Sequence, residues 1–397
     1  MRYEEVTVKT VLGKEHPHVD SWFWLSRSMN LYRGCSHSCW YCDGKAEYYR
    51  VNNFSTHIRV KINAPQVLRQ QLQQEGYVSS KQKSLFDYLD QKSDKPKTKK
   101  PKFILGLGGG VCDAYQPAEA KYKLSREVLK IALEFEFPIF ILTKSKLVLR
   151  DLDLLKQINK QSYANVSFSV TLAKDELQKI WEPKASSTTE RFEALKTFRG
   201  EGIYGGVFAM PLLPGIGDKE ENIRTLVEKA KNAKAEFFVP ADLTLKPERQ
   251  KNEFMQKLKK ENPELLELYN EIYGQNNIYG HPDTRKTVNV MKLGHEILKD
   301  YGIPNRVPRY IPEGRIESNL RVAEHLFQLD YLATYIHGWR QKAQALNRAA
   351  NIIDRLSQKI TTLSVEEMIN IGIEQWIIPE ITTFLQTGSS ELWQQLF

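Results

Sequence analysis

The chain has 397 residues, and its 57 Lys and Arg against 48 Asp and Glu give a formal net charge of +9. Hydrophobic residues make up 41% of it, a globular composition that excludes a disordered or collagen-like chain. No run approaches the roughly 20 apolar residues of a membrane helix, and the N-terminal MRYEEVTVKT lacks the apolar core of a secretory signal. We therefore expect a cytoplasmic protein that makes no membrane contact.

Short β-rich runs alternate with amphipathic stretches from about residue 28 to residue 245. The predicted strands are Ser28–Arg33, Phe103–Leu107, Pro138–Thr143, Asn165–Leu172, Ile203–Met210 and Ala235–Ala241, with an extra strand at His57–Ile62. The predicted helices are Ala64–Gln73, Ser125–Phe135, Asp151–Lys160, Glu190–Arg199 and Asn222–Ala233. This alternation predicts an α/β fold with a parallel sheet, an incomplete (β/α)6 barrel whose chemistry lies at the carboxyl ends of the strands.

The later part of the chain is predicted to be helical. Its helices are Glu248–Tyr273, Thr287–Tyr301, Asn319–Lys342, Ala343–Ile360 and Ser364–Ile378. Three capping boxes are predicted, pairing Ser187 with Glu190, Asp218 with Glu221 and Ser364 with Glu367. The domain prediction is an N-terminal segment 1–27, a barrel 28–250 and a helical C-terminal extension 251–397. Residues 79–102 carry eight Lys against three Asp and are predicted to form a flexible basic insertion.

Three of the four cysteines fall within one short stretch. Cys35, Cys39 and Cys42 have the spacing C-x3-C-x2-C directly after a predicted strand, and the fourth is Cys112. Three thiolates on one tight loop can bind three corners of an iron–sulfur cubane and leave one iron open for a small molecule. A closed zinc site would instead need a fourth ligand, for which Cys112 or His37 is a candidate. The open site suits an enzyme and the closed site a structural role.

Residues Asn30–Asp43, with the sequence NLYRGCSHSCWYCD, resemble the cluster loop of radical S-adenosylmethionine (SAM) enzymes of the spore photoproduct lyase-like (DNA repair photolyase-like) group. Residues 113–119, 143–151, 181–183 with Arg191, and 211–218 resemble that group in the same order. The resemblance implies a [4Fe–4S] cluster on Cys35, Cys39 and Cys42. It also implies reductive cleavage of SAM to a 5′-deoxyadenosyl radical, hydrogen abstraction from a substrate, and an electron donor such as flavodoxin or ferredoxin.

The same resemblance assigns candidate SAM-binding residues. Tyr41 would lie near the adenine, and Gly108, Gly109 and Gly110 would approach the SAM amino group, with Asp113 replacing the acidic residue that the motif usually contains. Lys144 would pair with the SAM carboxylate, Ser169 would donate or accept a hydrogen bond, and Arg191 would contact the carboxylate or pair with Glu182. Residue chemistry alone leaves plainer roles open: a buried aromatic side chain for Tyr41, a turn for the glycines, and a surface ion pair for Arg191.

Two positions depart from the lyase. The lyase uses a cysteine on its second barrel strand as hydrogen donor and has a tyrosine just after the third cluster cysteine. Here Asp43 occupies the tyrosine position, and Cys112 follows the second strand. Cys112 is a candidate catalytic hydrogen donor, or a small buried side chain. These departures argue against thymine-dimer repair and do not affect SAM cleavage.

The favoured substrate class is nucleic acid, DNA before RNA. The net charge, the basic insertion and the group Arg306, Arg309 and Tyr310 suit phosphates and stacked bases. Residues 82–89 resemble the short peptide that docks repair proteins on sliding clamps, although an amphipathic turn is the plainer interpretation. One alternative is a radical SAM enzyme that acts on a peptide, protein or small metabolite. Another is a non-catalytic, metal- or cluster-bearing nucleic-acid-binding protein.

Overall fold

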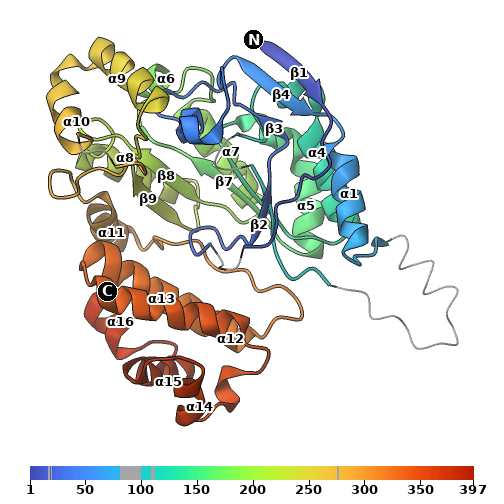
Figure 1. Ribbon diagram of the computed structural model, residues 1–397, viewed down its shortest axis with the longest axis vertical. Coiled ribbons are helices and arrows are strands. Elements are labelled where there is room, and N and C mark those ends of the chain that lie inside the picture. The colour runs from blue at the N-terminus through green and yellow to red at the C-terminus, as the bar shows by residue number, and fades with distance from the viewer. Residues whose placement is uncertain (17, 19, 81–99, 109–111, 275–276) are drawn as a thin grey trace, which may run out of the picture. The chain divides into compact units, whose positions relative to one another are not determined.

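The computed structural model describes residues 1–16, 18, 20–80, 100–108, 112–274 and 277–397 (Figure 1). They form two compact units: unit 1 holds Met1–Glu15 and Arg27–Val307, and unit 2 holds His16–Ser26 and Pro308–Phe397. No helix among these residues has both the length and the apolar character needed to cross a membrane. Most of the predicted insertion, including the clamp-like segment 82–89, lies outside the described residues. The predicted domain limits stay a prediction.

The centre of unit 1 is a sheet of six parallel strands in the order β2-β5-β6-β7-β8-β9. Their bounds are Arg27–Met29 (β2), Leu105–Leu107 (β5), Ile139–Thr143 (β6), Ala164–Ser169 (β7), Val207–Leu212 (β8) and Phe238–Asp242 (β9). Every residue of β7 is buried, as expected of a parallel strand covered on both faces. Because β2 and β9 end the order, the barrel is open, and the predicted incomplete (β/α)6 fold is confirmed.

Helices follow the strands of unit 1 (Figure 1). They are α1 (Ala64–Gln74), α3 (Ala118–Tyr122), α4 (Leu124–Glu134), α5 (Leu152–Gln161), α6 (Asp175–Trp181), α7 (Thr188–Gly200), α8 (Glu220–Asn232), α9 (Arg249–Glu261), α10 (Leu266–Ile272) and α11 (Val290–Tyr301). In α4, Val128, Leu129 and Ala132 recur at helical spacing and are fully buried, so one apolar face fixes the helix against its neighbours.

A second, smaller sheet precedes the first helix. Strand β4 (His57–Lys61) pairs in parallel with β1 (Arg2–Val6) and antiparallel with β3 (Tyr32–Arg33), so the predicted extra strand is confirmed. The prediction of one strand over 28–33 is wrong in one respect. The chain leaves the large sheet after Met29 and joins the small sheet at Tyr32. The cysteine loop therefore starts from the small sheet.

Unit 2 is helical beyond residue 316. Its helices are α12 (Glu317–Tyr331), α13 (Arg340–Arg355), α14 (Val365–Asn370), α15 (Ile378–Thr387) and α16 (Glu391–Leu396). The prediction of one helix over Asn319–Lys342 is wrong, because a π-helical turn at Leu332–Ile336 and Gly338 separate α12 from α13. The predicted nucleic-acid contact at Arg309 is also wrong. Its side chain is buried, pairs with Asp354 and lies 4.7 Å from the centre of the Trp24 ring.

The capping predictions have mixed outcomes. The Ser187–Glu190 and Ser364–Glu367 boxes are both formed and begin α7 and α14. The Asp218–Glu221 box is wrong, because α8 begins one residue later, after Lys219. The Asp218 carboxylate instead accepts a hydrogen bond from the amide of Gly215 at 2.7 Å, inside the loop after β8.

Candidate active site

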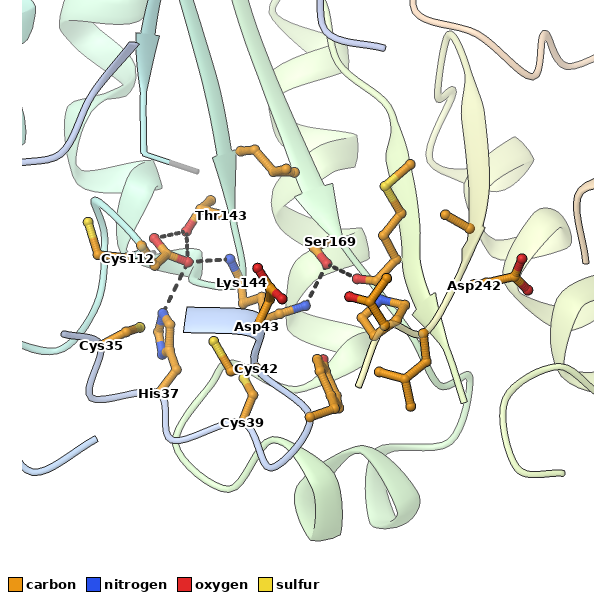
Figure 2. Close-up of a pocket in the computed structure, with 18 residues that line it drawn as sticks. Cys35, His37, Cys39, Cys42, Asp43, Cys112, Thr143, Lys144, Ser169 and Asp242 are labelled. Atoms are coloured by element: carbon orange, nitrogen blue, oxygen red, sulfur yellow. Dashed lines mark hydrogen bonds and ion pairs between the residues drawn. The ribbon is translucent and has the colours of Figure 1, made fainter. Parts of the chain in front are cut away.

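A cavity of about 400 Å³ lies at the carboxyl ends of the strands (Figure 2). The last residues of five strands of the large sheet, β5 to β9, or the loops after them contribute to it, together with the cysteine loop that follows β3. The lining residues are Cys35, His37, Cys39, Tyr41, Cys42, Asp43, Cys112, Asp113, Leu142, Thr143, Lys144, Ser169, Met210, Pro211, Ala241, Asp242, Leu243 and Thr244. The cavity therefore gathers most of the sequence-predicted site residues at the face that parallel β/α folds use for chemistry.

The cysteine loop is fastened to unit 1 through its backbone. It starts at Gly34, whose φ is +94° and where a Cβ would lie 2.8 Å from the carbonyl oxygen of Phe54, so only glycine fits. The buried amide of Gln116 donates to the Gly34 carbonyl at 3.0 Å and accepts from the Ser36 amide at 2.9 Å. These contacts hold the first cysteine in place without using its sulfur.

The loop is also fastened by residues that follow β9, which we call the latch residues: Lys246, Arg249 and Gln250. The Gln250 amide donates to the carbonyl of Tyr41 at 3.0 Å, and Arg249 Nε donates to the carbonyl of Lys45 at 2.7 Å. Lys246 forms an ion pair with Asp43. The last strand of the sheet thus holds the loop that starts near the first.

The three loop cysteines are free thiols, of which Cys35 and Cys39 are buried and Cys42 is partly exposed. Burial raises the pKa of Cys35, Cys39 and Cys42, and at Cys39 and Cys35 neighbouring acidic groups add to the effect. Among the described residues, no three His, Cys, Asp or Glu side chains converge to hold a single metal ion. A cubane instead binds each thiolate at a separate iron. The donor set therefore fits an iron–sulfur cluster, whose positive iron atoms would favour the thiolate form.

The opposite wall of the cavity carries charges that are already paired. Lys144, just after β6, donates from Nζ to Ser169 Oγ at 2.5 Å and lies 3.2 Å from Glu182 Oε1 (Figure 2). Behind it, the fully buried Arg191 pairs with Glu182 and donates to the carbonyl of Ser169 at 2.8 Å. Tyr41 donates its hydroxyl to the same Glu182.

Glu182 is the centre of this paired group. Burial alone would raise the pKa of its carboxyl group, but the charges of Arg191 and Lys144 outweigh burial and hold the pKa well below its usual range. Glu182 is therefore a charged carboxylate, and its ion pair with Lys144 holds the Lys144 side chain in position at the cavity surface. Arg191 was predicted to contact the SAM carboxylate or to pair with Glu182. It does not line the cavity, and it forms the ion pair with Glu182.

Asp113 joins the two walls. Its carboxylate accepts from Thr143 Oγ1 and from the amides of Lys144 and Tyr115, each at 2.8 Å, and His37 Nε2 lies 3.2 Å from it (Figure 2). Burial opposes its charge, but His37 and these donors lower its pKa. With its oxygens already occupied, Asp113 positions Lys144 and the cysteine loop in this structure.

Cys112 faces the cavity from the loop after β5. It is buried, and its thiol donates to Asn30 Oδ1 at 3.2 Å. Burial raises the pKa of this thiol to about 12. Cys112 is thus an S–H group at neutral pH, placed at the same cavity as the cluster cysteines.

Gly108 has φ +84° and ends β5, where a Cβ would lie 3.3 Å from the Ala114 amide nitrogen, but it does not line the cavity. Gly109 and Gly110 lie outside the described residues.

Sequence reasoning missed the part of His37 in the Asp113 contact and gave Glu182 only as a partner of Arg191. The position of Glu182 directly after the buried Trp181, in a region that resembles the lyase group, was the available signal.

A sequence profile of the radical SAM superfamily matches residues 29–227. An uncharacterised protein of Mycobacterium tuberculosis is 28% identical over 62% of this chain, and the match spans 66% of that relative, just under two thirds. An uncharacterised protein of Methanocaldococcus jannaschii is 30% identical over 48% of this chain and 62% of its own.

Two solved structures have a similar fold. Spore photoproduct lyase complexed with dinucleoside spore photoproduct aligns with a TM-score of 0.51 at 16% identity, over 75% of this chain and 79% of its own. A Tyr-to-Phe variant of the lyase also gives 0.51, at 17% identity, over 76% of this chain and 80% of its own. The superfamily uses a [4Fe–4S] cluster and SAM. The profile match over half the chain, together with the three cavity cysteines, shows that the chain belongs to the radical SAM superfamily.

Proposed function

We propose that this protein is a radical SAM enzyme that modifies or repairs a base in a nucleic acid, DNA before RNA. The observation that carries the radical chemistry is the single cavity in which Cys35, Cys39 and Cys42 face Lys144 and Ser169. When bound, the cluster supplies the electron that cleaves SAM to methionine and a 5′-deoxyadenosyl radical. The protein itself must position that radical and keep it from water.

The cavity side chains have distinct parts in this proposal. Cys35, Cys39 and Cys42 bind the iron atoms. Lys144, held by Ser169 and Glu182, presents a fixed positive charge to the SAM carboxylate. Tyr41, which lines the cavity, lies against the adenine. Asp113 and Arg191 act through Lys144 and Glu182 and are positioning residues.

Cys112 is the candidate catalytic hydrogen donor. Its thiol is protonated and lines the cavity, so it can return a hydrogen atom to a substrate radical. In that step the S–H bond breaks, a C–H bond forms on the substrate, and a thiyl radical remains on Cys112. An external one-electron donor such as flavodoxin or ferredoxin supplies the electron that reduces the cluster. The four free thiols suit a reducing cytoplasm.

The nucleic-acid assignment has a separate basis. The chain has a net charge of +9, and its fold is similar to that of a lyase solved with a dinucleoside lesion. Asp43 lies at the cavity where the lyase-like pattern has a tyrosine, so the lesion is expected to differ from a thymine dimer. Docking to a sliding clamp through residues 82–89 stays a prediction.

An anaerobic assay tests both parts. The protein is reconstituted with iron and sulfide, reduced, and given SAM with or without an ultraviolet-irradiated oligonucleotide. We expect about three to four iron atoms per chain and formation of 5′-deoxyadenosine. A rate that rises with the oligonucleotide supports the substrate class. Cleavage that responds only to peptides or metabolites would move the enzyme to the first alternative class. A preparation that binds iron and never cleaves SAM would contradict the radical function.

A further inference from the structure

Two segments that contact the cavity lining each carry a tyrosine whose side chain is mostly in solvent. Tyr48 is 81% exposed and Tyr279 is 64% exposed, the largest values among the exposed aromatic side chains of the described residues. Scattered exposed hydrophobic residues need no explanation, but the chain neighbours of these two, Tyr49 and Gly280, contact Asp43 and the backbone of Lys246 at the cavity. We call this pair, with the Asp43–Lys246 contact between them, the mouth surface.

One side of the mouth surface follows the third cluster cysteine. Asp43 lines the cavity and accepts a hydrogen bond from the Tyr49 hydroxyl at 2.6 Å. The ring of Tyr48 packs edge-on against Tyr49, with 5.4 Å between the ring centres. Lys246 pairs with Asp43 and lies 5.5 Å from the centre of the Tyr49 ring. Tyr48 is thus one residue away from a side chain that donates a hydrogen bond to the cavity-lining Asp43.

The other side follows β9. The Leu245 amide donates to the carbonyl of Gly280 at 2.8 Å. Gly280 has φ +69°, and a Cβ there would lie 2.4 Å from the Lys246 amide nitrogen. The loop that carries Tyr279 is therefore pressed against the backbone of Leu245 and Lys246, next to Thr244 of the cavity lining.

The backbone around Tyr48 is fastened as well. Arg33 donates to the carbonyl oxygens of Tyr49 at 3.1 Å and Arg50 at 3.3 Å. Arg249 ties the preceding turn to α9 through the carbonyl of Lys45. An exposed ring on a fastened backbone loses little conformational freedom when it binds a ligand. Aromatic rings of this kind are typical of binding surfaces.

The charges at the mouth favour an anionic ligand. Arg33 and Lys246 contact Tyr49, the residue after Tyr48, and Arg50 follows Tyr49 in the sequence. The acidic neighbours are Asp43, Glu47, Glu248 and Glu253, of which Asp43 is already paired with Lys246 and Glu253 with Lys45 at 2.9 Å. Aromatic rings for bases combined with cations for phosphates are the elements of a single-strand nucleic-acid site.

We infer that the mouth surface holds a single-stranded or flipped-out segment of nucleic acid, with bases stacked on Tyr48 and Tyr279 and the backbone near Arg50 and Lys246. This inference rests on the proposed function and names the surface by which that substrate reaches the cavity. An enzyme that reacts with a base must take it out of the stack, and the neighbouring bases then need partners. The two tyrosines supply them.

The test measures binding, and it does not depend on turnover. Fluorescence anisotropy compares a labelled single-stranded oligothymidylate with an oligonucleotide of the same length made of abasic sites. We expect the wild-type protein to prefer the base-bearing strand, since stacking on one aromatic ring strengthens binding by at least about fivefold. Tyr48→Ala and Tyr279→Ala should each lose at least about that factor, and Tyr48→Phe should retain the wild-type affinity.

Tyr204→Ala is the matched control. Tyr204 is 42% exposed and precedes β8, at the opposite end of the strands, so its removal should leave oligonucleotide affinity unchanged. Equal wild-type affinity for the base-bearing and abasic strands would overturn the inference. So would Tyr48→Ala and Tyr279→Ala variants that bind like Tyr204→Ala. Binding of an unstructured peptide of the same length in place of the oligonucleotide would also overturn it.

SAM cleavage, assayed in the same preparation, separates the two proposals. If SAM is cleaved and the two tyrosine-to-alanine variants bind the oligonucleotide like the wild type, the mouth surface is overturned and the radical function stands. Base-dependent binding without any SAM cleavage would support the mouth surface and contradict the radical function.

Discussion

The cavity has one wall of thiols and one wall of paired charges. On the first wall, Cys35 and Cys39 are buried, Cys42 is partly exposed, and burial raises the pKa of all three thiols. On the second wall, the negative charge of Glu182 is paired with the positive charges of Lys144 and Arg191. The first wall offers iron ligands, whereas the charged side chains of the second already pair with one another. Variants of the first wall should therefore affect cofactor content, and variants of the second should affect folding and affinity.

The largest effect is expected at the thiol wall. Cys35→Ala, Cys39→Ala and Cys42→Ala each remove one of three iron ligands, so the cluster and all SAM cleavage should be lost. Iron content per chain and 5′-deoxyadenosine measure this. Cys112→Ala, which removes the remaining thiol, should keep the iron. Full cleavage in any of the three loop variants would contradict the ligand assignment.

The next largest effect is expected at the centre of the paired wall. Glu182→Gln leaves the buried Arg191 without its counter-charge, and breaking a buried pair in this way costs about 3–5 kcal/mol. Urea unfolding measures the change in free energy. Glu201→Gln is the control, because its pair with Lys156 is exposed and contributes at most about 1 kcal/mol. Equal losses in the two variants would show that Glu182 does not organise the wall.

A smaller effect is expected at the cavity surface of the same wall. Lys144→Ala removes a charge-assisted contact to the SAM carboxylate, which should weaken SAM binding by roughly tenfold or more while iron is retained. Equilibrium dialysis with labelled SAM measures the affinity. Lys146→Ala, two residues away and exposed, should bind SAM like the wild type. Unchanged affinity of Lys144→Ala would remove Lys144 from the cofactor site.

The smallest effect concerns the origin of one hydrogen atom. A thiol hydrogen exchanges with solvent, so in heavy water the product should carry deuterium in the wild type and lose it in Cys112→Ala. Because burial raises the pKa of Cys112 to about 12, the S–H form predominates well below that pH. The incorporation should thus stay constant between about pH 7 and pH 9. Mass spectrometry of the product measures it, and incorporation that survives Cys112→Ala would exclude this donor.

The sequence was sufficient to predict what depends on local pattern. Hydrophobic alternation located the parallel strands, and the C-x3-C-x2-C spacing located the loop that lines the cavity. The resemblance to the lyase-like group supplied Lys144 and Ser169, which follow β6 and end β7 at the carboxyl ends of the sheet.

What depends on distant partners could not be predicted. The apolar pattern of residues 28–33 is continuous, although the hydrogen-bond partners change from β5 to β4 within it. Arg309 looks like a surface cation until Trp24 and Asp354 are brought against it by folding. Asp113 looks like a free carboxylate, and only the fold shows how many donors already reach it.

The latch residues have a consequence for the order of events during synthesis. The contacts from Lys246, Arg249 and Gln250 to the cysteine loop span 203, 204 and 209 residues of sequence. The cysteines leave the ribosome early, but the segment that fastens their loop is made long afterwards. A nascent chain that has not reached residue 250 therefore exposes its three thiols on an incompletely fastened loop. Delivery of iron and sulfide is accordingly expected to follow release of the last barrel strand, when the loop can be held in its final conformation.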